Sequence, residues 1–152
     1  MRALIAIAMM LCVCVTTHAL DFVVDGIYYR HSNNTDDVVS VIRNDNYSGA
    51  VVIPEVVVYE DKTYKVTGIH DSAFGSTSIT SVTIPNTVTY IGKGAFANCV
   101  GLTKITIPES VIKMGENVFS HSSKLKTVIS YSNVIGKSAF WNCRLIEVVF
   151  FN

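Results

Sequence analysis

Hydrophobic side chains recur with a fixed period along the second half of this chain. The period is marked by phenylalanines spaced 22, 23 and 21 residues apart, namely Phe74, Phe96, Phe119 and Phe140. A period of this size is typical of solenoid proteins, in which each copy is one unit of supersecondary structure. The sequence therefore predicts about four repeats, at residues 66–87, 88–110, 111–133 and 134–152.

Other positions repeat in step with the phenylalanines. A small or short residue precedes each one directly, at Ala73, Ala95, Val118 and Ala139, and an isoleucine or methionine stands earlier, at Ile69, Ile91, Met114 and Ile135. An aliphatic residue follows each one, at Ile79, Leu102, Leu125 and Leu145. One copy cannot bury so many apolar side chains alone, so we expect the copies to stack around a continuous core.

A strand is predicted near the end of each copy. The segments SVTIP (81–85) and KITIP (104–108) alternate apolar and polar residues with the period of a half-buried strand, and the prolines end it. The inward positions are then Val82, Ile84, Ile105, Ile107 and Val128. The outward positions are Ser81, Thr83, Lys104, Thr106, Thr127 and Ile129, which we take as the candidate binding face. Such a ladder also simply suits an exposed sheet, which is the competing interpretation.

Glycines follow the isoleucine or methionine column at Gly92, Gly115 and Gly136. We expect a sharp turn or a positive φ there, which would favour glycine. His70 takes this place in the first copy and suggests an irregular first repeat.

Residues 20–65 do not show the repeat and are predicted to form an N-terminal β-hairpin cap with a leading strand. FVVDGIYYR (22–30) and VVSVIR (38–43) flank a polar segment as in a hairpin, and NDNYSG (44–49) is typical of a turn. The VVIP segment (51–54) echoes the later VTIP, with YEDKTY (59–64) inserted as a hairpin. Such a cap would cover the edge of the first repeat.

The repeat unit resembles that of the BspA-like leucine-rich-repeat surface proteins, which reads IGxxAFxxCxxLxxIxIPxSVxx. The resemblance is carried by IGKGAFANCVGLTKITIPES (91–110), by IHDSAFGSTSITSVTIPNT (69–87) and by the copies at 114–130 and 135–150. It implies a β-rich leucine-rich-repeat solenoid with a short strand and an irregular or helical turn in each repeat. It also implies adhesion to host matrix proteins or to other cells.

The N-terminus predicts export. Residues 1–19 combine Arg2, an apolar run and a small-x-small site ending at Ala19, as in a secretory signal peptide. We therefore expect a secreted or cell-surface protein. Its formal net charge is +0, with 12 basic and 12 acidic residues. This balance lacks the excess of basic residues that is typical of proteins that bind nucleic acid or an anionic membrane.

The sequence predicts no catalytic, cofactor or metal site. Cys99 and Cys143 stand in the same column two copies apart, so their α-carbons should lie about 10 Å apart, too far for a disulfide. We expect two free, buried thiols that pack as small apolar residues. His31, His70 and His121 lack the paired spacing of zinc ligands and are expected to be solvated. No nucleophile elbow or phosphate-binding loop occurs, so we predict that the chain is not an enzyme and takes no small-molecule substrate.

Two hypotheses for the function follow. In the first, the chain binds a protein, for example of the host extracellular matrix, through the outward strand positions. In the second, it is a structural spacer or a truncated fragment of a longer array with no ligand of its own. The third copy has Ser130-Tyr131 in place of isoleucine and proline, and the sequence stops at VVFFN without a polar capping repeat. We therefore also expect self-association through the uncapped C-terminal repeat.

Overall fold

A computed structural model describes residues 21–32, 37–144 and 147–151. The predicted signal peptide at 1–19 and the aliphatic position Leu145 lie outside these residues. Every regular element in the three described ranges is a β-strand, so the turns between strands are irregular rather than helical. The strands are β1 (Phe22–Val24), β2 (Ile27–His31), β3 (Val38–Val41), β4 (Ser48–Val52), β5 (Val56–Tyr59), β6 (Lys62–Ile69), β7 (Ser78–Thr83), β8 (Tyr90–Ile91), β9 (Lys104–Ile107), β10 (Lys113–Met114), β11 (Thr127–Ser130) and β12 (Glu147–Phe150).

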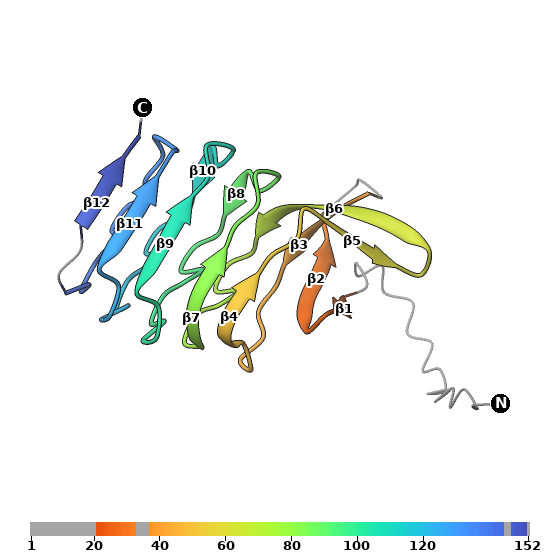
Figure 1. Cartoon of the computed structure of the whole chain (residues 1–152), viewed down its shortest axis with the longest axis horizontal. Coiled ribbons are helices and arrows are strands. Elements are labelled where there is room, and N and C mark those ends of the chain that lie inside the picture. Colours follow the sequence, from red (N-terminus) through yellow and green to blue (C-terminus); the bar gives the residue numbers. More distant parts are fainter. Residues whose placement is uncertain (1–20, 33–36, 145–146, 152) are drawn as a thin grey trace.

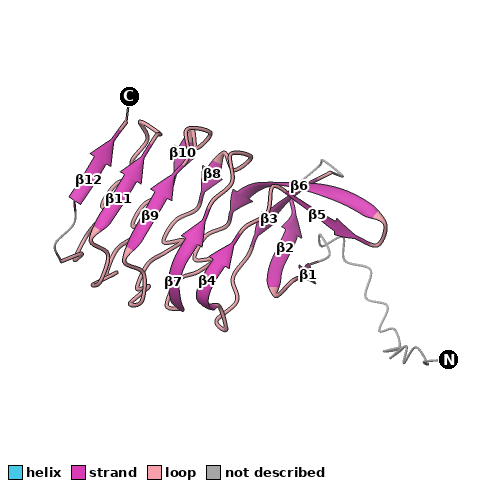
Figure 2. Ribbon diagram, in the orientation of Figure 1, coloured by secondary structure: helices cyan, strands magenta, loops and turns pink. Residues whose placement is uncertain are grey.

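The strands form the two sides of a flattened coil (Figures 1 and 2). On one side β4 pairs with β7, and β9 pairs with β11 and β11 with β12, all in parallel. On the other side the order is β1-β2-β3-β6-β8-β10, with β5 paired to β6. Because each turn of the chain contributes one strand to each side, the parallel pairing follows from the repeat itself.

A ladder of aromatic rings runs through the core between the two sides. Phe74, Phe96, Phe119 and Phe140 stack in succession, with ring centroids 5.2, 5.7 and 5.5 Å apart and interplanar angles of 10° or less. The five inward strand residues predicted from the alternation are all buried. The phenylalanines therefore lie in one continuous core between the two sides.

Backbone hydrogen bonds join neighbouring repeats outside the strands as well. The amides of Phe74, Phe96 and Phe119 each donate to a carbonyl of the following repeat at 2.8 Å. Buried amides need such partners, because an unpaired one costs free energy comparable to a lost hydrogen bond. Backbone hydrogen bonds between repeats thus hold the irregular turns in register, as they do the strands.

Residues 38–54 take part in the coil, although their sequence does not show the repeat. Val41 at the end of β3 pairs with Ile69, and Val51 in β4 pairs with Val82. The Tyr47 ring lies 4.8 Å from the Phe74 ring and begins the aromatic ladder. The segment therefore fills the columns of a repeat with Tyr47 in place of phenylalanine.

The N-terminal strands extend the second side of the coil. Asp25 and Gly26 have φ angles of 49° and 78° and turn β1 into β2, as in a two-residue hairpin. Strand β2 then pairs antiparallel with β3, which pairs with β6 in parallel. The β5–β6 hairpin turns at Glu60 and Asp61 and projects from the coil in Figure 1.

The repeated glycines are required by close packing, and the prediction of a positive φ at Gly92, Gly115 and Gly136 is wrong. Positive φ angles are found for the glycines Gly26, Gly49 and Gly94 among the described residues. A Cβ at Gly115 would lie 2.4 Å from the backbone nitrogen of Lys93 in the preceding repeat. A side chain is tolerated at His70 because that position borders a hollow of about 200 Å³.

Candidate binding surface

The six predicted outward residues lie together on the side of the coil formed by β7, β9 and β11 (Figure 1). Ser81, Thr83, Lys104 and Thr106 are exposed, whereas Thr127 and Ile129 are half-buried. The alternation of the sequence thus identified the outer sides of these strands, and their role in binding stays a prediction. The face becomes less exposed from β9 to β11.

Pairing aligns the outward residues in two columns across the strands. Lys104, Thr127 and Glu147 stand opposite one another in β9, β11 and β12, and so do Thr106, Ile129 and Val149. The β4–β7 pair forms a sheet of its own, in which Ala50 pairs with Ser81 and Val52 with Thr83. One column is therefore polar, with a lysine and a glutamate, and the other is β-branched.

Aromatic side chains border this face at the ends of the strands. The rings of Tyr131 and Phe151 stack 5.1 Å apart, and their side chains are 48% and 49% exposed. Both residues line a cavity of about 560 Å³ that also involves Ile112, which is 75% exposed. Tyr131 departs from the repeat in the sequence but was not predicted as a site residue. The sequence did contain a signal for this residue, because Tyr131 stands where the earlier repeats have Pro85 and Pro108.

The cysteine column carries hydrogen bonds that were not predicted from the sequence. Cys99 and Cys143 are free, with Cys99 buried and Cys143 partly buried. The Cys99 thiol donates to the carbonyl of Phe74 at 3.0 Å, and the Cys143 thiol donates to that of Phe119 at 2.9 Å. Between them, the Ser122 hydroxyl donates to the carbonyl of Phe96 at 2.8 Å. A short side chain that donates a hydrogen bond therefore occupies this position in each of the three repeats. The cysteines form hydrogen bonds in addition to packing as small side chains.

Burial also affects the acidity of these thiols. It raises the pKa of Cys99 to about 11, and it raises the pKa of Cys143 as well. A thiol with a raised pKa is a poor nucleophile at neutral pH, because the thiolate is the reactive form. The column is thus suited to packing and hydrogen bonding.

Two of the histidines, His31 and His70, line one hollow of about 200 Å³ with Arg30. His121 contacts the edge of the Trp141 ring, with centroids 4.7 Å apart, and its Nδ1 lies 3.0 Å from the Asn142 amide nitrogen. His31 packs against Tyr64, and His70 is exposed. No group of three histidine, cysteine, aspartate or glutamate side chains that could hold a metal occurs in residues 21–32, 37–144 and 147–151.

The family profile described as "BspA type Leucine rich repeat region (6 copies)" matches residues 54–152. The chain belongs to this family of leucine-rich-repeat proteins, so the resemblance seen in the repeat is confirmed. Leucine-rich-repeat proteins are generally binding modules without enzymatic activity, and the chain is accordingly a repeat module of the protein-interaction type. A search of curated proteins gave no match.

Solved structures share the fold. A leucine-rich repeat protein from Bacteroides capillosus is 28% identical, with a TM-score of 0.76 over 87% of this chain and 99% of that one. Another from Bacteroides ovatus is 32% identical, with a TM-score of 0.68 over 86% of this chain and 37% of that one. A leucine rich cell surface protein from Faecalibacterium prausnitzii is 23% identical, with a TM-score of 0.62 over 86% of this chain and 42% of that one.

A search for membrane spans, limited to the described residues, found no helix long and apolar enough to cross a bilayer.

Proposed function

We propose that this chain is a secreted or cell-surface module that binds a protein partner, such as a host matrix protein, through the face formed by β7, β9 and β11. The observation that carries the proposal is the alignment of Lys104 with Thr127 and Glu147, beside the column of Thr106, Ile129 and Val149. A rigid sheet that presents side chains in register offers many weak contacts at once, and these add when the partner is also repetitive or extended.

The predicted signal peptide and the cell-surface relative support placing the module outside the cell. The chemistry of the face supports a protein ligand. It combines short hydroxyl side chains, a β-branched column and the stacked Tyr131–Phe151 pair, and aromatic residues are enriched in protein interfaces.

The test replaces two face residues together, Lys104→Glu and Thr106→Glu, and measures adhesion of the protein to matrix-coated surfaces. The matched control is Lys65→Glu with Thr63→Glu, which changes the same residue types at the same spacing on exposed positions of β6. We expect the face variant to lose most of its adhesion and the control to retain it. Equal adhesion by both variants would instead favour a structural spacer without a ligand of its own.

We also propose that the last described repeat pairs with a second copy of the chain. Among the described residues β12 pairs with β11 alone, and Phe150 at its end and Phe151 directly after it are 46% and 49% exposed. An unpaired strand edge flanked by aromatic side chains is a ready template for association.

A further inference from the structure

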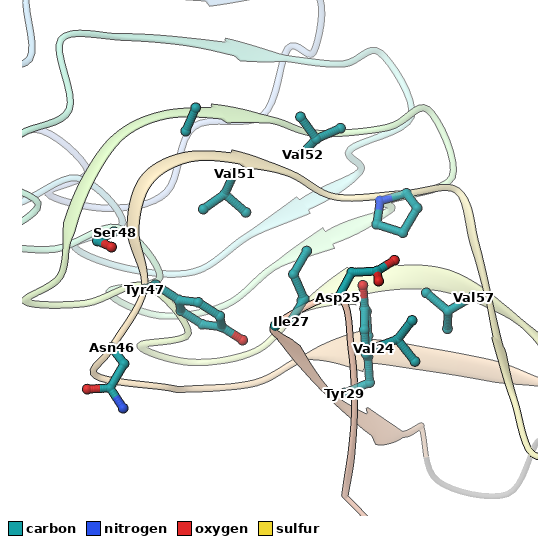
Figure 3. A pocket seen from close by; sticks show the side chains of 13 residues that line it. Val24, Asp25, Ile27, Tyr29, Asn46, Tyr47, Ser48, Val51, Val52 and Val57 are labelled. Atoms are coloured by element: carbon teal, nitrogen blue, oxygen red, sulfur yellow. The ribbon is translucent and has the colours of Figure 1, made fainter. Parts of the chain in front are cut away.

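A groove lies at the opposite end of the coil, between β4 and the turn that joins β1 to β2 (Figure 3). Its volume is about 350 Å³, within the range of natural ligand sites. Its walls combine polar and apolar surface. The apolar side chains are Val24 and Ile27 on one side, Val51 on the other, and Val57 of β5 at one end.

One wall of the groove is the free edge of a strand. Within the described part of the chain, β4 pairs with β7 alone. The carbonyl of Tyr47 accepts from the amide of Ser78, and the amide of Ile53 donates to the carbonyl of Thr83. The register shifts between Gly49 and Ala50, so the direction of bonding is counted back from Ile53, and it alternates along the strand. The backbone groups of Ala50 and Val52 therefore face the groove, and both residues line it; Ser48, before the shift, also lines it.

The floor of the groove contains a polar atom without a partner. The Tyr29 side chain is 0% exposed, and its hydroxyl has no hydrogen-bond partner among the described residues. The hydroxyl points toward the Asp25 side chain at the mouth of the groove (Figure 3). Asp25 is exposed, and it lines the groove together with Tyr29. A buried hydroxyl left unpaired is costly, which favours any ligand that supplies the missing bond.

The charge of the groove limits the ligand. Asp25 is the only residue charged at neutral pH among the described residues that line it. A negative charge in the groove favours a cationic group on the ligand, and the open strand edge favours a backbone in extended form.

We propose that this groove binds an extended peptide that adds to the free edge of β4 and places a lysine or arginine beside Asp25, with a polar atom on the Tyr29 hydroxyl. The site is separate from the face of β7, β9 and β11, and the inference does not rest on the function proposed for that face. Main-chain pairing supplies affinity in such complexes, and the pockets for alternate side chains supply specificity.

The test titrates the full chain with two blocked pentapeptides of alternating valine and threonine, one with a central lysine and the other with a central glutamate. Amide chemical shifts in an isotope-labelled protein give both the affinity and the place of binding. We expect the lysine peptide to shift the amides of Ser48, Ala50 and Val52 and the glutamate peptide to bind about tenfold more weakly. Absence of shifts along β4, or equal binding of both peptides, overturns the proposal.

Two variants test the named side chains. Asp25→Asn retains a residue suited to the turn and should bind the lysine peptide about tenfold more weakly. Its matched control is Asp61→Asn, which neutralises an aspartate at a similar φ of 61° in the β5–β6 turn and should bind normally. Weakening by both variants alike, or by neither, contradicts the role of Asp25.

Tyr29→Phe should also weaken peptide binding several-fold while leaving the urea midpoint of the free protein unchanged or higher, because it removes an unpaired buried hydroxyl. A lower midpoint with unchanged affinity would show that the hydroxyl serves the fold and would overturn its role in binding. The variant Lys104→Glu with Thr106→Glu should bind the peptide normally, so that failure here and failure of the proposed adhesion are distinguishable.

Discussion

At the residue scale, one glycine column sets how closely the repeats approach. Gly92, Gly115 and Gly136 lie against the backbone of the preceding repeat, and at Gly115 the added Cβ would also lie 2.7 Å from the α-carbon of Lys93. Backbone atoms cannot move aside as the end of a flexible side chain can. The spacing of the coil therefore depends on the absence of a single methyl group at each step.

Gly115→Ala is expected to destabilise the protein by about 3 kcal/mol or more, because the two repeats must separate to admit the methyl group. Gly26→Ala is the matched control. Its φ is 78° and nothing lies within 4 Å of the position that a Cβ would take, so only backbone strain of about 1 kcal/mol applies. Urea unfolding followed by circular dichroism measures both. If Gly115→Ala cost no more than Gly26→Ala, close packing would not explain the column.

The Cys99 thiol predicts a dependence of stability on alkaline pH. Its pKa is raised from 9.0 to about 11 in the folded protein, chiefly by burial, so the unfolded chain loses this proton first. The stabilising contribution is fully present below pH 9 and is lost as the pH rises toward 11. At pH 10 the loss amounts to about 1 kcal/mol.

The measurement compares urea midpoints at pH 8 and pH 10 in a Cys143→Ser background, with and without Cys99→Ser. Serine keeps a donor for the Phe74 carbonyl and does not titrate in this range. We expect the protein that retains Cys99 to lose more stability over this interval. A parallel loss in both would assign the alkaline sensitivity to other groups. Tyr47 also has a pKa raised by burial, to about 12, and its effect begins at higher pH.

At the element scale, the period of the hydrophobic residues was enough to predict the strands that carry a full repeat. Alternation at 81–85 and 104–108 identified β7 and β9 and the inward side chains of each. The short strands β8 and β10 were not predicted, because a strand of two residues has no periodicity to detect. They form because each lies beside a strand of the preceding repeat.

The repeat formed by residues 38–54 escaped prediction for a different reason. Tyr47 replaces phenylalanine, and the β5–β6 hairpin lies between it and Phe74, which stretches the local spacing beyond that of the later copies. The outward residues of the candidate face followed from alternation along single strands. The groove beside β4 could not be predicted, because Asp25 of the β1–β2 turn, Tyr29 of β2 and Val57 of β5 come from segments that only the fold brings together.

At the scale of the whole molecule, the coil has two ends with different chemistry. At one end, β4 leaves an edge open beside a groove that contains one acidic side chain. At the other, β12 ends in the exposed Phe150, followed by the exposed Phe151. Because the strands of one side run parallel, the two ends are not equivalent, and an assembly that joined unlike ends would grow without closing. Pairing of like ends would stop at a dimer.

The proposed association through β12 predicts a dimer that one charge can disrupt. Phe150→Lys places an ammonium group on the exposed end of β12 and should give a monomer where the unchanged protein dimerises, because inward- or edge-placed lysines oppose strand pairing. The matched control is Val58→Lys on β5, where the side chain is 61% exposed and apolar but lies at the other end of the coil. Size-exclusion chromatography with light scattering, over a wide range of protein concentration, reports the mass of each. A monomer at all concentrations for the unchanged chain would contradict the proposed association. A dimer that survives Phe150→Lys and dissociates with Val58→Lys would show that the contact is formed by another surface.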